Sequence, residues 1–184
     1  YIIIPLYLHL VIYHHLIKAW TEFFNFYKIA LELFLDFKLI KKDKHSGARY
    51  GEIETPHGKF QTPVFMPVGT LGTVKALTPE HLHDSNTNAI LCNTYHLTLR
   101  PGEDVVRNCG GLHKFIGWDK TIITDSGGYQ IFSLSDFIKV SDEGAAFKSP
   151  VDGSDIFISP EKAIEIQELL GADIMMAFDE CVPY

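Results

Sequence analysis

The stretch TIITDSGGYQIF, residues 121–132, decides the fold. Its first four residues are β-branched and predict a short buried strand, and a carboxylate, a hydroxyl, two glycines and a tyrosine follow at once. A buried strand that ends in polar side chains is typical of an α/β protein whose ligand binds at the carboxyl ends of the strands. We therefore expect Asp125 to be held rigidly where a ligand can reach it.

Two other apolar segments end in the same way. The segment Ala89–Cys92 is followed by Asn93, and the segment Ile174–Phe178 is followed by Asp179. Continuous apolar strands that alternate with helices predict a parallel sheet buried on both faces. The polar residues after the three strands should then gather at one edge of that sheet.

The helices between these strands carry start signals. A hydroxyl residue precedes proline at Thr78-Pro79 and at Ser159-Pro160, which is typical of an N-cap followed by the first helical residue. Upstream, residues 48–70 alternate short apolar runs with glycine and proline, which predicts a small antiparallel element. The helix after Ser159 is expected to bury an apolar face and to stop at a glycine: Ile164, Leu169, Leu170 and Gly171.

Composition describes a globular chain of 184 residues with a formal net charge of -7 and 21% charged residues. An acidic chain is a poor indiscriminate binder of phosphate backbones, although a local basic patch stays open. Its three cysteines form no C-x-x-C motif, which favours reduced thiols and a cytoplasmic protein. No Walker loop or GxGxxG supports a nucleotide cofactor. Six weaker candidates are assigned structural roles: Cys92 and Cys109 inside the protein, the pair His81 and His83 at the surface, His96 packed beside Cys92, and Asp152 in a turn.

The first 36 residues differ from the rest. Residues 1–17 contain no Asp, Glu, Lys or Arg, yet they are short for a membrane span and include three histidines and a proline. They also lack the basic start and cleavage site of a signal peptide. We interpret residues 1–36 as an apolar, aromatic-rich extension, native or not, ahead of a domain that begins near Phe37, and membrane association is not expected. A helical membrane anchor is the alternative.

The residues after the strands suggest a class of ligand. The two glycines after Ser126 let the backbone turn sharply and approach a ligand, with N–H groups free to donate. Tyr129 offers a flat ring for stacking, and Asp179 can accept two N–H groups side by side, which suits the edge of a guanine-like base. Together they favour a planar, nitrogen-rich heterocycle. For each residue alone, the alternative is structural: Asp125 caps a turn and Tyr129 packs in the core.

Five long motifs closely resemble the tRNA-guanine transglycosylases (queuine/preQ1 tRNA-ribosyltransferases), the bacterial type in particular. These enzymes have a (β/α)8 barrel with a zinc-binding insertion. They are pentosyltransferases that replace guanine at the wobble position of a G-U-N anticodon by a 7-deazaguanine in queuosine biosynthesis. The resemblance runs from about Phe37 to Tyr184. The motifs are VFMPVGT, CNTYHLTLRPG, GGLHKFIGWDKTIITDSGGYQIFSL, DEGAAFKSPVDGS and SPEKAIEIQELLGADIMMAFDEC.

The resemblance also implies roles for individual residues. Asp125 would be the catalytic acid/base carboxylate, and Asn93 would orient it. Cys181 matches the bacterial residue beside a small aminomethyl group, which favours preQ1 (7-aminomethyl-7-deazaguanine) over queuine. Cys92 stands where the family is expected to carry glycine. The other substrate-binding residues would be Ser126, Gly127 and Gly128 in the pocket wall, Tyr129 stacked on the base, and Asp179 on its Watson–Crick edge.

Length sets a limit on this comparison. A (β/α)8 barrel needs about 250 residues, and the resemblance covers only the last four-fifths of a 184-residue chain. We therefore expect the front half of a barrel, preceded by a small antiparallel element. In the family, the nucleophilic aspartate and the zinc ligands, three cysteines and one histidine, come later than Tyr184. We expect no metal ligands in this chain, no activity of the chain alone, and a homodimer for the full-length enzyme.

Two other functions remain open from the sequence. One is a non-catalytic subunit of a transglycosylase, although such a subunit has no need of Asp125, Tyr129 and Asp179. The other is a glycoside hydrolase that uses Asp125 and Asp179 as its pair of carboxylates. The two glycines and the tyrosine fit a base better than a sugar.

Overall fold

The computed structural model describes residues 35–134 and 137–180. The chain divides into two units after Phe34, and all described residues belong to the second unit. The interpretation of the N-terminal extension therefore lies almost entirely outside the described residues, and the domain start near Phe37 stays a prediction. Within the described residues, none of the helices has the length and apolar character needed to cross a membrane.

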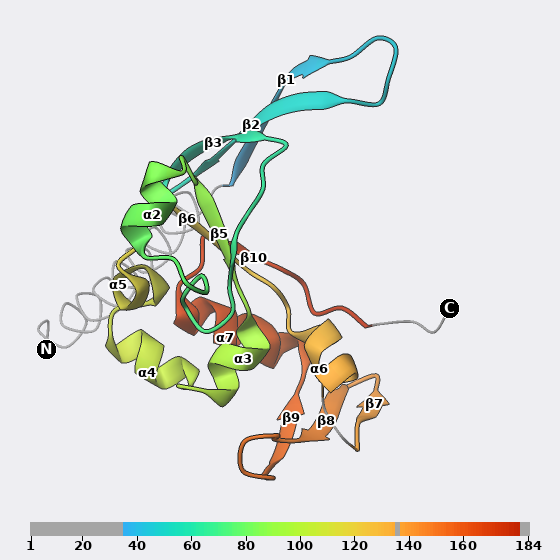
Figure 1. Ribbon diagram of the computed structural model, residues 1–184. Coiled ribbons are helices and arrows are strands. Elements are labelled where there is room, and N and C mark those ends of the chain that lie inside the picture. The colour runs from blue at the N-terminus through green and yellow to red at the C-terminus, as the bar shows by residue number, and fades with distance from the viewer. Residues whose placement is uncertain (1–34, 135–136, 181–184) are drawn as a thin grey trace, which may run out of the picture. The chain divides into compact units, whose positions relative to one another are not determined.

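The expected antiparallel element is a three-stranded sheet in the order β1-β2-β3 (Figure 1). Phe60 on β3 and Thr55 on β2 are buried, whereas β1 is exposed along its whole length. The element starts earlier than the glycine and proline pattern predicts, because the lysine-rich β1 also pairs with β2. Its strands are β1 Asp36–Lys42, β2 Arg49–Thr55 and β3 Gly58–Thr62.

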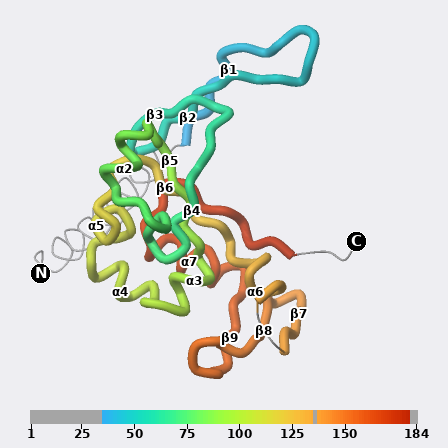
Figure 2. Tube along the Cα trace, viewed as in Figure 1, coloured from blue at the N-terminus to red at the C-terminus, as the bar shows by residue number. Residues whose placement is uncertain are grey.

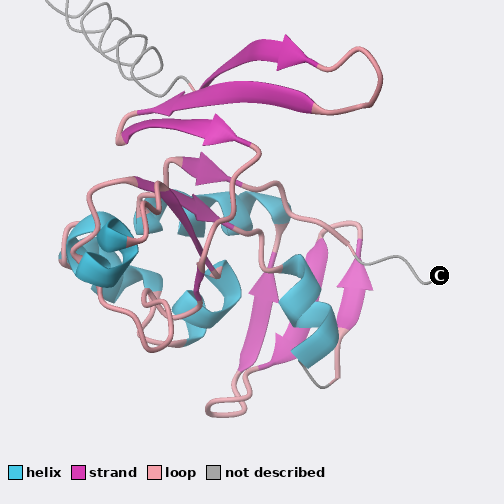
Figure 3. Cartoon of the chain, turned by 45° about the horizontal axis from the view of Figure 1, so that its top comes forward, coloured by secondary structure: helices cyan, strands magenta, loops and turns pink. Residues whose placement is uncertain are grey.

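A parallel sheet in the order β10-β6-β5-β4 follows, as the sequence predicts. Figure 3 shows the strands in magenta and the helices around them in cyan. The central strands β5 and β6 are almost fully buried, with Ala89, Ile90 and Ile122 at most 1% exposed. The described residues thus form an open α/β sheet and not a closed barrel. The strands are β4 Val68–Gly69, β5 Ala89–Cys92, β6 Thr121–Thr124 and β10 Ile174–Met175.

The last strand is shorter than predicted. The apolar run Ile174–Phe178 suggested five strand residues, but β10 ends at Met175. Among the described strands β10 pairs only with β6, and β6 itself ends at Thr124. The backbone of Met176 makes one more bond to this strand, from its N–H to the Thr124 carbonyl at 3.2 Å. Beyond it, an apolar sequence has no neighbouring strand to continue the ladder.

The helices begin where the capping residues predict. The side chains of Thr78 and Ser159 each accept a hydrogen bond from the third helical N–H, and Gly171 ends α7 in the left-handed conformation with φ of 74°. The buried face of α7 includes Leu170, as predicted, but the rest of it differs: Ala163, Ile166 and Gln167 are buried, while Ile164 and Leu169 are only half-buried. The helices are α2 Pro79–Asp84, α3 Thr94–Leu99, α4 Glu103–Asn108, α5 Leu112–Ile116, α6 Gly128–Leu134 and α7 Pro160–Leu170.

The error over α7 has a packing cause. Apolar residues occur on more than one side of this helix, and the side that is buried is the one that contacts α3, α4 and β10. Gln167 lies on that side and is fully buried. A pattern that counts only apolar residues cannot include it, because burying an amide requires hydrogen-bond partners that the sequence does not reveal.

A third sheet, antiparallel and in the order β7-β8-β9, lies between α6 and α7 along the chain (Figure 2). The sequence pattern did not predict it. Ala145 and Phe147 of β8 and Ile158 of β9 belong to the hydrophobic core, which also contains Trp118 and Tyr95. The strands are β7 Lys139–Ser141, β8 Gly144–Lys148 and β9 Asp155–Ile158.

Three minor predictions can be checked against the fold. Asp152 lies in the turn between β8 and β9, where its carboxylate accepts hydrogen bonds from the N–H and hydroxyl of Ser154, as expected. Cys92 is buried as predicted, but Cys109 is exposed. Cys109 is the C-cap of α4, and the turn that follows through Gly110 leaves its side chain outside the core.

Candidate active site

The carboxylate of Asp125 is held at the carboxyl end of β6 by groups from the neighbouring strand end. The side-chain amide of Asn93, which follows β5, donates to Oδ2. The N–H of Thr94 donates to Oδ1 at 2.9 Å, and the Thr94 hydroxyl donates to the Asp125 carbonyl at 2.6 Å. Two adjacent strand ends are therefore joined through one carboxylate, which is half-buried.

A third donor reaches the Asp125 carboxylate from α6, the helix that follows it in the chain. The Nε2 of Gln130, on the first turn of α6, donates to Oδ2 at 2.9 Å. Sequence reasoning missed both Gln130 and Thr94. Gln130 could have been found, because it lies five residues after Asp125, within reach across the turn that the two glycines make. Thr94 reaches the carboxylate through its backbone N–H, a contact that the residue type does not reveal.

The second carboxylate, Asp179, is attached to the first through Ser126. The hydroxyl of Ser126 donates to Asp179 Oδ1. The N–H of Gly128 donates to the Ser126 oxygen at 3.2 Å. It is therefore paired within the protein, whereas the sequence led us to expect it to be free for a ligand. Ser126 thereby links the ends of β6 and the segment after β10, which the sequence placed at the same edge of the sheet.

Each of the two glycines has a separate structural reason. Gly127 has φ of 83°, and a β-carbon there would lie 3.3 Å from the backbone nitrogen of Tyr95. Gly128 has ordinary dihedral angles, but a β-carbon would overlap the backbone carbonyl of Asp179. The turn of Gly127 and Gly128 can therefore approach Tyr95 and Asp179 this closely only because neither glycine has a side chain.

The ring of Tyr129 is not part of the core. Tyr129 is the second residue of α6, after Gly128, and is 61% exposed, which contradicts the structural alternative for this residue and leaves its stacking role untested. The structural alternative for Asp125, that it caps a turn, is partly right, since it accepts the first N–H of α3. Cys181 lies outside the described residues.

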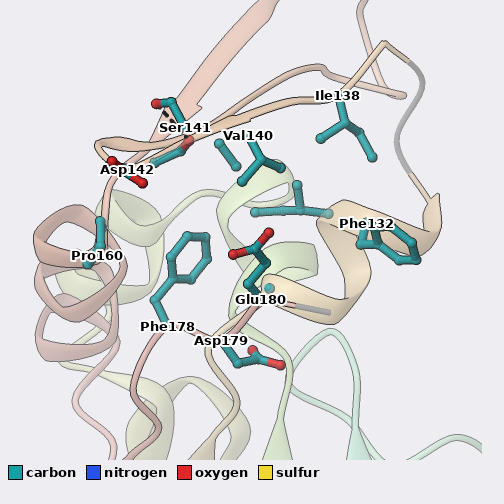
Figure 4. Close-up of a pocket in the computed structure, with 13 residues that line it drawn as sticks. Phe132, Ile138, Val140, Ser141, Asp142, Pro160, Phe178, Asp179 and Glu180 are labelled. Carbon is teal, nitrogen blue, oxygen red and sulfur yellow. Dashed lines mark hydrogen bonds between the residues drawn. The ribbon is translucent and has the colours of Figure 1, made fainter. Parts of the chain in front are cut away.

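A pocket of about 420 Å³ lies beside these residues, between α6, the β7–β8 hairpin and the segment after β10 (Figure 4). Phe178 and Glu180 extend into it, whereas Asp179 points to the other side of its segment, toward Ser126. The residues that line it are mainly apolar, with three acidic residues among them: Gly128, Ile131, Phe132, Ile138, Val140, Ser141, Asp142, Gly144, Ala145, Pro160, Phe178, Asp179 and Glu180.

Comparison with known proteins identifies the family. The family profile described as queuine tRNA-ribosyltransferase matches residues 43–184, which include every element from β2 onward. The chain belongs to the queuine tRNA-ribosyltransferase family. A relative of that name from Enterococcus faecalis is 62% identical over 148 residues, which are 80% of this chain and 39% of the relative. The relative from Bacillus subtilis is 59% identical over the same lengths, and one from Oceanobacillus iheyensis is 59% identical over 150 residues. The chain spans about 40% of the length of these relatives.

The queuine tRNA-ribosyltransferase resemblance raises the question of zinc. Of the two cysteines in the described residues, Cys92 is buried at the end of β5, and Cys109 is exposed on α4. Burial, together with the negative charge of Asp125, raises the pKa of the Cys92 thiol to about 12, so Cys92 is a poor source of the thiolate that zinc prefers. The described residues do not fit a site of three cysteines and one histidine, and we derive no catalytic step through a metal.

One cluster of possible metal ligands occurs at the opposite, amino-terminal ends of the strands. His57, His113 and Asp173 bring their ligand atoms within 4.8 Å of one another. The two rings are stacked, with centroids 3.6 Å apart and planes inclined by 15°. Because imidazole binds a metal along a direction in the plane of its ring, two nearly parallel stacked rings do not point at a common ion. The pair His81 and His83 contributes to no such cluster: His81 caps its own helix and His83 stacks on Trp118.

The cluster is better described as a buried carboxylate with three donors. His57 Nδ1 lies 2.6 Å from one oxygen of Asp173, and His113 Nε2 lies 3.2 Å from the other. The N–H of Ile122 on β6 donates to that second oxygen at 2.8 Å. His113 Nε2 also lies 3.1 Å from the Lys120 carbonyl, so both of its neighbours are acceptors and this nitrogen must carry a proton. Asp173 therefore ties the β2–β3 turn and α5 to the start of β10.

This cluster predicts an acid-sensitive stability. Burial raises the pKa of the Asp173 carboxyl, but hydrogen bonds from His113, His57 and Ile122 outweigh burial and hold the pKa below its ordinary value of 3.8. A carboxyl whose pKa is lower in the folded state stabilises fully above its unfolded pKa and loses that contribution as the pH falls through the folded value. Asp173→Asn should lower the free energy of unfolding by about 1–3 kcal/mol at pH 7, and the deficit should shrink below about pH 4.

Urea unfolding at several pH values measures this effect. The control is Asp155→Asn, which removes a carboxylate that is 85% exposed and paired with Lys148. It should unfold like the unsubstituted chain at every pH. A deficit for Asp173→Asn that is the same at pH 3 and pH 7 would show that the charge of Asp173 is not what stabilises the cluster.

Proposed function

We propose that the full-length protein is a tRNA-guanine transglycosylase that exchanges the wobble guanine of a G-U-N anticodon for a 7-deazaguanine in queuosine biosynthesis. The observation that carries this proposal is the way Asp125 and Asp179 are held together. Asp125 accepts hydrogen bonds from Asn93, Thr94 and Gln130, and Asp179 accepts one from Ser126. Two carboxylates fixed against one glycine-lined turn suit a base that presents N–H groups.

The residues then divide the reaction between them. Asp125 takes the proton that the incoming base loses and returns one to the departing guanine, as a general acid/base. Asp179 accepts N–H groups of the base edge, while Ser126, Gly127 and Gly128 form the wall and the exposed ring of Tyr129 stacks on the base. Asn93, Thr94 and Gln130 keep the Asp125 carboxylate in one orientation, which favours proton transfer in a fixed direction.

The remaining parts of the proposal come from the family resemblance. The parallel strands β4, β5, β6 and β10 are proposed as the first part of a (β/α)8 barrel, with Asn93, Asp125 and Asp179 at its carboxyl-terminal rim. Outside this chain, the full-length enzyme is expected to contain the nucleophilic aspartate and a zinc site of three cysteines and one histidine. It is expected to act as a cytoplasmic homodimer. A non-catalytic subunit or a glycoside hydrolase has no specific support from the geometry.

The base that is inserted gives a test of this function. We expect preQ1, because Cys181 matches the bacterial residue beside a small aminomethyl group, and an amine is positively charged near neutral pH. The nearby pocket has the acidic residues Asp142 and Glu180 in its lining, which favour a cationic substituent. Single-turnover incorporation of labelled preQ1 and queuine by the full-length enzyme should show a clear preference for preQ1.

Other outcomes of that assay have distinct meanings. A preference for queuine would overturn the bacterial assignment, and equal use of both bases would mean that Cys181 does not set the size of the pocket. Incorporation of neither base, in an enzyme that is folded and binds tRNA, would favour a non-catalytic subunit.

A further inference from the structure

Gln167 is a fully buried amide near the middle of α7, with 0% exposure. Its Oε1 accepts hydrogen bonds from the hydroxyl of Thr124 at 2.8 Å and from the N–H of Met176 at 3.0 Å. Its Nε2 donates to the carbonyls of Ala163 at 3.1 Å and Met176 at 3.0 Å. A primary amide has two donors and two acceptor positions, and here all four are used inside the protein.

These four bonds join the two strands that carry the carboxylates. Thr124 is the last residue of β6 and directly precedes Asp125. Met176 follows the last residue of β10 and lies three residues before Asp179. Since β10 stops at Met175, one bond from the Met176 N–H to the Thr124 carbonyl is the last that joins this segment to the backbone of β6 in the manner of a ladder. Gln167 holds both the N–H and the carbonyl of Met176 as well. The register of this segment against β6 therefore depends on α7 in addition to that single bond.

We propose that Gln167 is a positioning residue that sets the spacing between Asp125 and Asp179. It touches neither carboxylate and acts through Thr124 on one side and Met176 on the other. Ser126 makes the second link between the two carboxylates, farther along the strand ends. The proposal rests on the proposed function in one respect, because it assumes that Asp125 and Asp179 act on the same base.

The chemistry of the site requires an amide. An ionised glutamate at residue 167 would direct carboxylate oxygens at the carbonyls of Ala163 and Met176, which accept and cannot donate. A neutral glutamic acid regains one donor and is close to glutamine in shape. Leucine would leave the buried Thr124 hydroxyl and the partly buried backbone of Met176 without these partners. The three side chains should therefore act differently, and glutamate should depend on pH.

The first experiment uses the 184-residue chain itself and requires no activity. Amide hydrogen exchange of Met176 should be accelerated about tenfold or more by Gln167→Leu, since the N–H loses the shorter of its two bonds and keeps only the one to the Thr124 carbonyl at 3.2 Å. The control is Leu170→Val, which disturbs the buried face of the same helix. Because the leucine side chain has no polar atoms, this substitution removes no hydrogen bond to either strand end. It should leave the exchange of Met176 unchanged relative to neighbouring amides. Equal acceleration by both variants would overturn the proposal.

The second experiment measures base exchange in a chimera in which residues 43–184 replace the matching segment of the Enterococcus faecalis relative. Gln167→Leu should lower kcat about tenfold or more, because a small displacement of one carboxylate against the other misaligns the base. The KM for tRNA should change less than about twofold, because most tRNA affinity comes from backbone contacts elsewhere. Leu170→Val should keep kcat within about twofold of the parent, since it loses core packing alone.

A pH profile separates positioning from a loss of stability. Gln167→Glu should be impaired at pH 8 and should recover activity relative to the parent as the pH falls, because burial favours the neutral acid. A parallel pH profile for Gln167→Glu and the parent, or a kcat unchanged by Gln167→Leu, would overturn the proposal. A parent chimera without activity would count against the proposed function. In that case the exchange of Met176 alone decides whether Gln167 joins the two strand ends.

Discussion

Replacing Asp125 by asparagine is expected to lower the rate of base exchange by about 10²–10⁴-fold, while tRNA binding is retained. The amide cannot take up the proton of the incoming base. It also replaces one carboxylate oxygen by a donor, which must face either the Thr94 N–H or the amides of Asn93 and Gln130, all of which donate to Asp125 in the native site. The tRNA itself should bind through contacts with its sugar–phosphate backbone that lie outside these strand ends.

The measurement is exchange of labelled guanine by the chimera described above, together with a tRNA binding assay. Asp152→Asn is the matched control, because Asp152 is an exposed turn carboxylate bonded to Ser154 and away from the strand ends. It should exchange guanine at the rate of the parent. If the Asp125→Asn variant exchanged guanine at a rate close to that of the parent, this carboxylate would have no part in the mechanism.

Gly128→Ala is expected to weaken use of the free base by about tenfold or more in KM, because displacing a binding group by a fraction of an ångström costs affinity and alignment. The new methyl group would overlap the carbonyl of Asp179 and must push that segment away from α6. Overpacking of this kind costs about 1–3 kcal/mol of stability, so the variant should still fold. Asp179 would then present its carboxylate from the wrong place.

The control for this substitution is Gly47→Ala, where a β-carbon would have no heavy atom within 4 Å and the backbone has no positive φ. It should leave both the KM and the unfolding midpoint unchanged. An unchanged KM for the base in Gly128→Ala would mean that the close approach of Asp179 to α6 plays no part in base binding.

Much of the site could be predicted from the sequence, because the strands that carry it have a clear local pattern. TIIT before Asp125 and AILC before Asn93 are apolar runs of strand length, and parallel strands bring their carboxyl ends to one edge. The link from Asn93 to Asp125 is present in the structure as the resemblance implied. The helix starts at Thr78 and Ser159 could also be predicted, since a capping hydroxyl followed by proline favours the start of a helix through local interactions alone.

What the sequence did not reveal depends on distant partners. The end of β10 at Met175 is decided by the length of β6, and the burial of Gln167 is decided by Thr124 and Met176 meeting α7. The β7–β8–β9 sheet has short strands with exposed outer residues, so its alternation is weak. The His57–Asp173 pair joins residues 116 positions apart, and no local pattern predicts such a contact.

The central claim is that the strand ends of this chain supply the base site of a transglycosylase, and guanine exchange by the chimera tests it most directly. Residues 43–184 in the Enterococcus faecalis relative should exchange labelled guanine into a tRNA with a G-U-N anticodon. The isolated 184-residue chain should exchange no more guanine than a control reaction without enzyme. A folded, tRNA-binding chimera that exchanges no guanine would contradict the account.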